Sequence, residues 1–118
     1  MEATKEQKEG IASAIEFYME GGRQADGTIT AKAFTDNATM SWAENGKMIS
    51  VPIQTLFDGV TNGKAEAASY EIVSLDVQED IAVVHIKSQF GDAKYYDMFS
   101  LVKDGSDWKI VSKIYRNR

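Results

Sequence analysis

The second half of the chain places the strongest limit on its fold, because three turn signals divide it into four strand-like runs. The signals are Gln78-Glu79-Asp80, Gly91-Asp92 and Asp104-Gly105-Ser106-Asp107. The runs beside them are rich in β-branched and aromatic residues, which favour strands. Turns this short join neighbouring strands that run in opposite directions. The sequence therefore predicts a four-stranded antiparallel meander.

The start of the chain predicts two helices. Apolar residues recur at helical spacing from residue 5 to about residue 21: Ile11, Ala14, Ile15 and Tyr18. The pair Gly21-Gly22 is expected to end this helix. The carboxylate of Asp26 can accept hydrogen bonds from the free amides of a first turn, so we expect it to cap a second, short helix through Phe34. A turn at Thr35-Asp36-Asn37 would follow.

A hairpin and a third helix are expected before the meander. Asn45-Gly46 is a strong tight-turn signal, and it lies between two strand-like runs, 39–43 and 47–51. Pro52 suits the first turn of a helix that would end near Asn62-Gly63. The predicted fold class is therefore α+β, with N-terminal helices packed in the concave face of a curved antiparallel sheet. A single domain over residues 1–118 is expected.

Composition limits the classes of function. With no cysteine and one histidine, the chain excludes disulfides, cysteine-ligated zinc and histidine-rich metal sites, and we expect no metal and no cofactor. The net charge of −5 opposes binding to a phosphate backbone, so no nucleic-acid partner is expected. No apolar stretch approaches the roughly 18 residues that span a bilayer. We therefore expect no membrane partner and a cytoplasmic location.

The turns also predict which side chains share a face of the meander. The expected pairs are Phe90 with Ala93, Val84 with Phe99, Lys103 with Trp108, Phe99 with Ser112, and Asp97 with Ile114. One face is then mostly apolar and should meet the helices: Ala82, Val84, Ile86, Asp97, Phe99, Leu101, Trp108, Ile110, Ser112 and Ile114.

The reverse face of the meander mixes apolar and charged residues: Val83, His85, Lys87, Tyr96, Met98, Ser100, Val111, Lys113 and Tyr115. This mixture is typical of a surface on which a second sheet docks. We therefore expect a homodimer whose interface includes Val83, His85, Tyr96, Met98, Val111 and Tyr115. The basic cluster Lys109, Lys113, Arg116 and Arg118 is interpreted as a solvated strand face.

The order of these elements resembles the nuclear transport factor 2-like superfamily over nearly the whole chain. The most specific stretch is Phe99 to Tyr115, in which a turn precedes a final Trp-basic-Ile strand similar to the lumazine-binding and SnoaL-like branches. "AFTDNAT", Ala33 to Thr39, resembles the segment that closes helix two in the superfamily. The resemblance implies a cone-shaped α+β barrel with a pocket.

Ketosteroid isomerases are members of this superfamily, and they pair an aspartate base with an oxyanion hole of a tyrosine and a protonated carboxylic acid. Aligned on "AFTDNAT", this chain has Tyr18 at the tyrosine position and Asp26 at the helix-capping aspartate. Trp42 occupies the base position, and the second acid falls near Phe99. The resemblance therefore implies the shape of the pocket, and it argues against isomerisation by that mechanism.

Seven residues are candidates for the pocket: Tyr18, Met40, Trp42, Phe57, Asp97, Phe99 and Ser112. Tyr18 either directs its hydroxyl at a ligand or is a core tyrosine, and Trp42 either lines a cavity or fills it. Asp97 is a weak catalytic candidate, as a buried general acid or base; its alternatives are an ion pair with Arg116 and exposure at the rim. Ser112 either donates to a ligand or is simply small.

Three functions remain open. The first is a pocket that binds a small hydrophobic or heteroaromatic molecule without transforming it. The second is an enzyme of the SnoaL-like cyclase, dehydratase or isomerase type, in which Asp97 transfers a proton and Tyr18 polarises a carbonyl. The third is a dimeric adaptor with a vestigial cavity. We favour ligand binding, because both isomerase carboxylates are missing.

Overall fold

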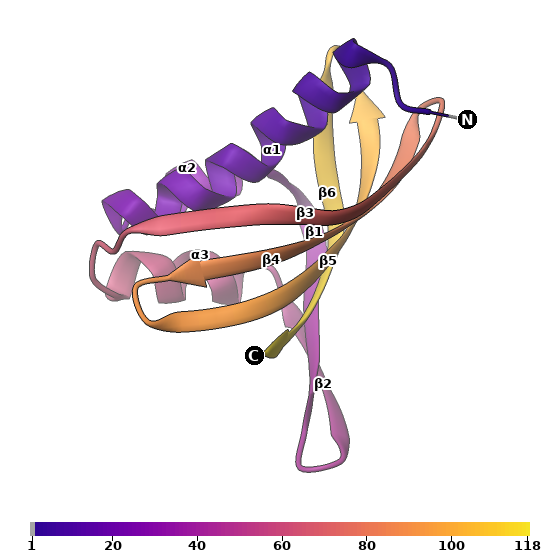
Figure 1. Cartoon of the computed structure of the whole chain (residues 1–118). Coiled ribbons are helices and arrows are strands. Elements are labelled where there is room, and N and C mark those ends of the chain that lie inside the picture. Colours follow the sequence, from indigo (N-terminus) through magenta and orange to yellow (C-terminus); the bar gives the residue numbers. More distant parts are fainter. Residues whose placement is uncertain (1) are drawn as a thin grey trace.

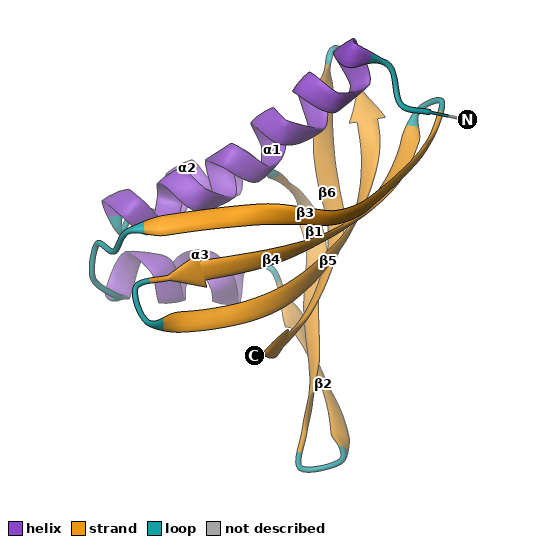
Figure 2. Ribbon diagram, in the orientation of Figure 1, coloured by secondary structure: helices purple, strands orange, loops and turns teal. Residues whose placement is uncertain are grey.

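The computed structural model describes residues 2–118 and contains three helices and six strands within them (Figures 1 and 2). The elements are α1 (Lys5–Gln24), α2 (Gly27–Ala31), β1 (Phe34–Glu44), β2 (Lys47–Pro52), α3 (Gln54–Asn62), β3 (Ala68–Gln78), β4 (Ile81–Phe90), β5 (Ala93–Asp104) and β6 (Asp107–Asn117).

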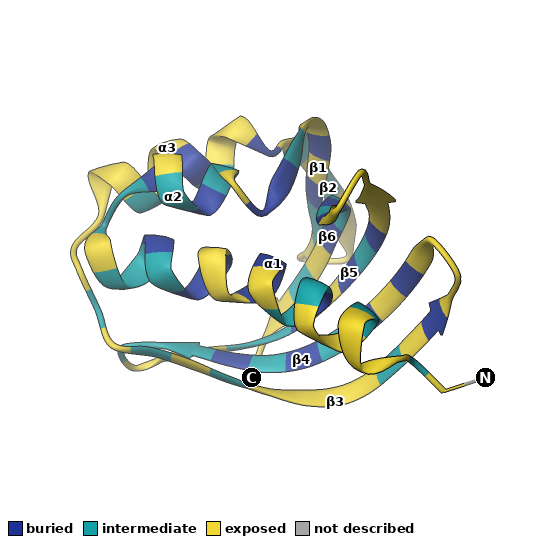
Figure 3. Cartoon of the chain, turned by 90° about the horizontal axis from the view of Figure 1, so that it is seen from above, coloured by how far each residue is buried: buried dark blue, intermediate teal, exposed yellow. Residues whose placement is uncertain are grey.

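The strands form one curved, unclosed sheet in the order β2-β1-β6-β5-β4-β3. The meander β3 to β6 is antiparallel, as predicted, whereas β1 runs parallel to β6. The helices lie on one side of the sheet, and the β1–β2 hairpin projects away from them (Figure 1). In Figure 3, α1 lies over the sheet, while β3 is exposed along most of its length. The α+β class and the helices in the concave face are confirmed.

Helix α1 is longer than expected, because Gly21-Gly22 does not end it. Thr4 and Gln7 form a capping box at its start, and Ala25 ends it in the left-handed conformation, with φ of 50°. The glycine has a different role: a Cβ on Gly21 would lie 1.8 Å from Oγ1 of Thr30. Gly21 therefore allows α2 to pack directly on α1.

Two boundaries near α2 also differ from the expectation. Asp26 caps α2 by accepting from the amide of Thr28 at 2.9 Å, as predicted, but the helix ends at Ala31. Thr35-Asp36-Asn37 belongs to β1 instead of a turn, at a point where the pairing between β1 and β6 is irregular. The Asn45-Gly46 hairpin is confirmed, whereas Pro52 closes β2 and α3 begins at Gln54.

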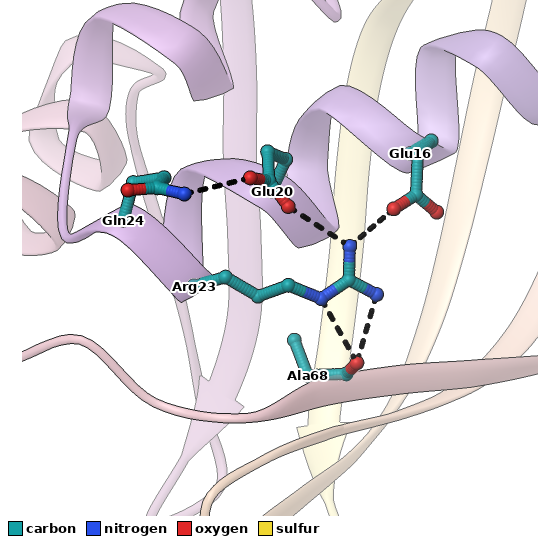
Figure 4. A network of polar contacts seen from close by, with 5 residues as sticks. All are labelled: Glu16, Glu20, Arg23, Gln24 and Ala68. Atoms are coloured by element: carbon teal, nitrogen blue, oxygen red, sulfur yellow. Dashed lines mark hydrogen bonds and ion pairs between the residues drawn. The ribbon is translucent and has the colours of Figure 1, made fainter.

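Arg23 ties the end of α1 to the edge strand β3 (Figure 4). Its guanidinium donates to the carbonyl of Ala68 from Nε at 3.3 Å and from Nη2 at 2.9 Å. Its Nη1 contacts the carboxylates of Glu16 and Glu20 on the helix itself. Because these acids hold the guanidinium in place, Arg23 fixes the end of α1 against the start of the edge strand β3.

A β-bulge in β6 changes which side chains face inward. The pairs Phe90 with Ala93, Val84 with Phe99 and Lys103 with Trp108 are confirmed. Leu101 pairs with Ile110, however, while Ser100 pairs with Ser112, so Val111 is an extra residue on β6. An extra residue reverses the alternation beyond it.

Four positions on β6 were therefore assigned to the wrong face. Phe99 pairs with Lys113, not Ser112, and Asp97 pairs with Tyr115, not Ile114. Lys113 is 3% exposed and turns inward, whereas Ile114 is 49% exposed on the outer face. Ser112 accompanies Ile114 outward, and Tyr115 packs against the core. Lys113 is thus not part of a solvated basic face.

The core fills the space between α1 and the sheet. It contains the apolar stripe of α1 and the inward residues of the meander: Ile11, Ala14, Ile15, Met19, Ala82, Val84, Ile86, Phe99, Leu101, Trp108 and Ile110. Five aromatic pairs with edge-to-face geometry link Tyr18, Phe34, Phe57, Phe90 and Phe99 in this core. The end of the cone beside the β4–β5 hairpin is less completely filled, and a cavity lies there.

Candidate functional site

The cone cavity lies between the second half of α1, α3, the β4–β5 hairpin and the end of β6, and it has a volume of about 530 Å³. Aromatic and aliphatic side chains form much of its wall, together with Lys64, Glu66 and Lys113. The lining residues that matter here are Tyr18, Met40, Phe90, Tyr95, Lys113 and Tyr115. The cavity is therefore largely apolar, and Lys113 is the buried cationic group in its wall.

A buried polar cluster lies behind this wall, centred on Asp97 of β5, which is 0% exposed. Its Oδ2 accepts hydrogen bonds from the Tyr18 hydroxyl at 3.1 Å and from Oγ of Ser88 at 2.6 Å. Its Oδ1 lies 3.4 Å from Nζ of Lys113 but has no well-aligned hydrogen-bond partner among the described residues. The Asp97 side chain is thus held in place by two hydroxyl donors and one lysine.

Lys113 is the cationic partner in this cluster. Its Nζ lies 3.9 Å from the centre of the Tyr115 ring and 5.7 Å from the centre of the Tyr18 ring. Burial lowers the pKa of Lys113, and the negative charge of Asp97 opposes part of this shift. Because Lys113 lines the cone cavity, its ammonium can also donate to a molecule there.

Tyr18 positions the cluster from α1. Burial, and after it the charge of Asp97, raise the pKa of the Tyr18 hydroxyl well above its usual value, so the hydroxyl stays protonated at neutral pH. Its single proton is donated to Asp97. A ligand carbonyl would therefore receive its hydrogen bond from Lys113 and not from Tyr18.

The predicted pocket residues occupy different places. Tyr18 and Met40 line the cone cavity, and Asp97 lies behind its wall, paired with Lys113 and not with Arg116. Four further candidates do not line the cone cavity. Phe57 and Phe99 are buried in the core, and Trp42 lies beside Tyr115, with ring centres 5.4 Å apart. Ser112 is on the opposite face of the sheet.

Sequence reasoning missed Lys113, Ser88 and Tyr95. Lys113 was missed because strict alternation from Trp108 gives an apolar inward face that includes Ile110 and Ile114, which looks correct. A single bulged residue, Val111, makes that pattern misleading, and nothing in the local sequence marks it. Ser88 follows directly from the confirmed register of β4, two residues beyond Ile86 on the same face.

The outer face of the sheet is the second notable surface. Apolar side chains lie exposed across it, among them Val83 at 55% and Met98 at 42%. A broad open hollow of about 900 Å³ lies on it, lined in part by Trp42, Met48, His85, Tyr96, Met98 and Ile114. This hollow is larger than the cone cavity, but no residue of the buried polar cluster lines it. Tyr18 and Lys113 of that cluster line the cone cavity, which is therefore the candidate site.

Among residues 2–118, no three histidine, aspartate or glutamate side chains gather in a way that could hold a metal ion. No helix in the same residues combines the length and the apolar character needed to cross a membrane.

The fold and its cavity define the class, which is the nuclear transport factor 2-like group of cystatin-like α+β folds. Within this class, the chain belongs to the family described as "Putative lumazine-binding", whose model matches residues 6–116. The family is named for a small bicyclic heteroaromatic molecule.

Solved structures agree with this assignment. A nuclear transport factor 2-like protein of unknown function from Shewanella baltica OS155 is 31% identical, with a TM-score of 0.87 over 99% of this chain and 98% of that one. A second, from Silicibacter pomeroyi DSS-3, is 23% identical, with a TM-score of 0.87 over 99% and 100%. A ketosteroid isomerase-like protein from Erwinia carotovora atroseptica SCRI1043 shares the fold at 16% identity, with a TM-score of 0.69 over 97% and 98%. No curated protein matches the sequence.

Proposed function

We propose that this domain binds a small, carbonyl-bearing heteroaromatic molecule in the cone cavity, with the Lys113 ammonium as its polar anchor. The observation that carries the proposal is the position of Lys113, which is almost fully buried and yet lines the cavity. A buried ammonium with free donors is costly unless an acceptor is supplied. A ring carbonyl in the cavity would supply one.

The dimensions and chemistry of the cavity support this ligand class. A volume of about 530 Å³ lies within the roughly 300–1,000 Å³ range of small-molecule pockets. Tyr95, Tyr115 and Phe90 offer ring faces and edges against which a flat ring system can pack. The family name points to the same class of molecule.

The charges near the cavity favour a neutral ligand. Asp97 and Lys113 form one ion pair, and Lys64 and Glu66, at 4.0 Å, form another on the cavity lining. The charges in the lining and directly behind it therefore balance, and none is left over to pair with an anion or a cation. Neutral ring systems with carbonyl acceptors satisfy Lys113 without adding a buried charge.

Titration calorimetry with lumazine tests this proposal. We expect saturable binding to the wild type, weakened about tenfold or more in Lys113→Met, because a hydrogen bond to a charged group contributes about 1.5–3 kcal/mol. Lys103→Met is the matched control, since Lys103 is exposed on β5 and distant from the cavity lining. Equal affinity in the two variants would remove Lys113 as the anchor. Absence of binding by lumazine and by related ring diones would remove the ligand class.

Lys113→Met leaves Asp97 without its cation and lowers the stability of the fold, so a second variant is needed in case the first does not fold. The double variant Asp97→Asn with Lys113→Met avoids this problem, because it removes both charges together. It should fold and still bind lumazine weakly. Wild-type affinity in this double variant would count against the anchor.

The outer face supports a second part of the proposal, a homodimer formed through it. Val83, Met98 and Ile114 expose apolar surface on adjoining strands, and His85 lies close to Tyr96, with ring centres 5.8 Å apart. A second copy of the same face would remove this surface from water. Analytical ultracentrifugation should report a dimer that Met98→Lys converts to a monomer. Phe17→Lys, which alters an exposed apolar residue on α1, should leave the dimer unchanged; a wild-type monomer at high concentration would contradict the dimer.

Proton transfer by Asp97 and Tyr18 has less support as an alternative. Asp97 is not part of the cavity lining, and its oxygens already face Tyr18, Ser88 and Lys113. A substrate would reach the carboxylate only through one of these groups. Of the groups that hold Asp97, Tyr18 and Lys113 line the cavity, and Tyr18 already donates its proton to Asp97.

A further inference from the structure

Lys113 differs from every other lysine in residues 2–118, all of which are exposed or half-buried. Its amine lies at the wall of an apolar cavity, and the ring of Tyr115 at 3.9 Å covers one side of it. A desolvated amine in an apolar pocket is a nucleophile toward carbonyl carbon. The placement therefore has a chemical consequence beyond hydrogen bonding.

We propose that Lys113 captures aromatic aldehydes covalently, by forming a Schiff base with an aldehyde that enters the cone cavity. This inference rests on the proposed function, because it uses the same cavity and the same residue. It adds a covalent step and a substrate class. The geometry that supports it is an amine at the wall of an aromatic cavity, with a carboxylate directly behind it.

The reaction balances without an added reagent. The neutral amine of Lys113 attacks the aldehyde carbon, a C–N bond forms, and the carbonyl oxygen takes up protons and leaves as water. Overall, the ammonium and the aldehyde give a protonated imine and one water. The positive charge on nitrogen is the same before and after, so the site exchanges one cation for another.

Asp97 can stabilise the cation on the Lys113 nitrogen both before and after the reaction. Its Oδ1 lies 3.4 Å from Nζ of Lys113, close enough to stabilise the protonated imine as it stabilises the ammonium. Its Oδ2 is fixed by Tyr18 and Ser88, so the carboxylate cannot rotate away. Asp97 is a positioning residue here, because it acts on the aldehyde only through Lys113.

Desolvation favours the reactive form of the amine. Burial lowers the pKa of Lys113, so a larger fraction is neutral at a given pH than for an exposed lysine. An aromatic ring on the aldehyde adds packing against Tyr95 and Phe90, which also line the cavity.

Reductive trapping tests the inference on the wild-type chain. The protein is incubated near neutral pH with equimolar 4-hydroxybenzaldehyde and cyanoborohydride, which reduces the imine to a stable amine. Proteolysis and mass spectrometry then locate the adduct. We expect one adduct, on Lys113, formed faster than any adduct at the exposed Lys103. Adducts on exposed lysines with Lys113 unmodified would overturn the inference.

Two controls separate covalent capture from general lysine reactivity. Lys103→Met should leave the Lys113 adduct unchanged, whereas Asp97→Asn with Lys113→Met should abolish it. The pH profile of trapping at Lys113 should also rise at lower pH than that at Lys103. Identical pH profiles at the two lysines would count against the inference.

The outcomes distinguish this inference from the proposed function. If lumazine binds and Lys113 is not trapped, the covalent step is wrong while the binding function stands. If Lys113 is trapped and lumazine does not bind, covalent capture stands and the proposed ligand class is wrong. Protection of Lys113 from trapping by lumazine would support both, because it would place the two molecules in one cavity.

Discussion

The two ends of the cone use the same strands in different ways. At the end where the β5–β6 turn lies, Ile11 and Ile15 of α1 meet Leu101, Trp108 and Ile110, all of them buried. At the cavity end, the second half of α1 faces Ser88, Asp97 and Lys113, which are equally buried but polar or charged. The first end is packed for stability, and the second end holds an ion pair beside open space.

The bulge at Val111 separates these two ends. Before it, β6 presents Trp108 and Ile110 inward, and after it Lys113 and Tyr115. Bulges occur often beside functional sites, where they redirect a side chain. One extra residue thus allows the same strand to place apolar side chains in the core at one end and a charged side chain at the cavity at the other.

The largest expected effect is at the cavity end, with Lys113→Ala. Removing the cation leaves the carboxylate of Asp97 buried without a partner, so we expect the free energy of unfolding to fall by about 3–5 kcal/mol. Lys109→Ala, on the same strand before the bulge, should cost less than about 1 kcal/mol, because Lys109 is only half-buried. Denaturant unfolding measures both. Equal losses would mean that the two ends do not differ in the way described.

Leu101→Ala tests the opposite end. The lost packing should lower the free energy of unfolding by about 2–4 kcal/mol, since Leu101 is 1% exposed. Lumazine affinity should not change, because Leu101 does not line the cone cavity. Calorimetry of the folded variant checks the second point. A weakened affinity would show that the packed end and the cavity are coupled.

Tyr18→Phe removes one donor to Asp97 and should cost about 1.5–3 kcal/mol at neutral pH. The cost should shrink above about pH 10, where the tyrosine of the unfolded chain ionises. The pKa of Tyr18 is raised by folding, so the folded state keeps its proton there and the wild type loses stability that the variant cannot lose. Unfolding of both proteins from pH 7 to pH 11 measures the gap. A gap that widens with pH would contradict the raised pKa.

The smallest effect expected is that of Gly21→Ala, about 1 kcal/mol or more of destabilisation. Alanine favours a helix interior by about 1 kcal/mol over glycine, but here its Cβ would collide with Oγ1 and the amide of Thr30. Gly59→Ala is the control, because a Cβ on Gly59 of α3 meets nothing within 4 Å. Thermal unfolding should separate a destabilised first variant from an unchanged or stabilised second. If both were stabilised, the close contact of α1 with α2 would be unimportant.

Much of the fold follows from the sequence because its signals are local. Local residues alone predicted the three turns of the meander, the Asn45-Gly46 hairpin and the Asp26 cap. The pair Gly21-Gly22 was wrongly predicted to end α1, because helix propensity carries no information about a second helix that packs on the first. Thr30 lies on the next helix, α2, and its close approach to Gly21 comes from the packing of the two helices and not from the helical pattern of α1.

The candidate site was harder to predict from the sequence than the fold, because its side chains were assigned to a face by strand periodicity. The alternation of apolar and polar residues is the main sequence signal for which face of the sheet a side chain occupies. One extra residue in β6 reverses this alternation for every residue beyond it. The register of β5 follows from the β4–β5 hairpin, which has no bulge, so Asp97 was placed inward correctly. Lys113 follows the bulge on β6, so the same reasoning placed it outward and paired Asp97 with Arg116.

The parallel pairing of β1 with β6 constrains the order in which the molecule can fold. During synthesis, β1 and β2 precede their partner β6, so the edge of β1 that pairs with β6 stays unpaired until Asp107–Asn117 has emerged from the ribosome. Pairing between segments so distant in sequence forms slowly. We therefore expect the nascent chain to remain dependent on chaperones until β6 is made, and the cavity to be among the last features to form.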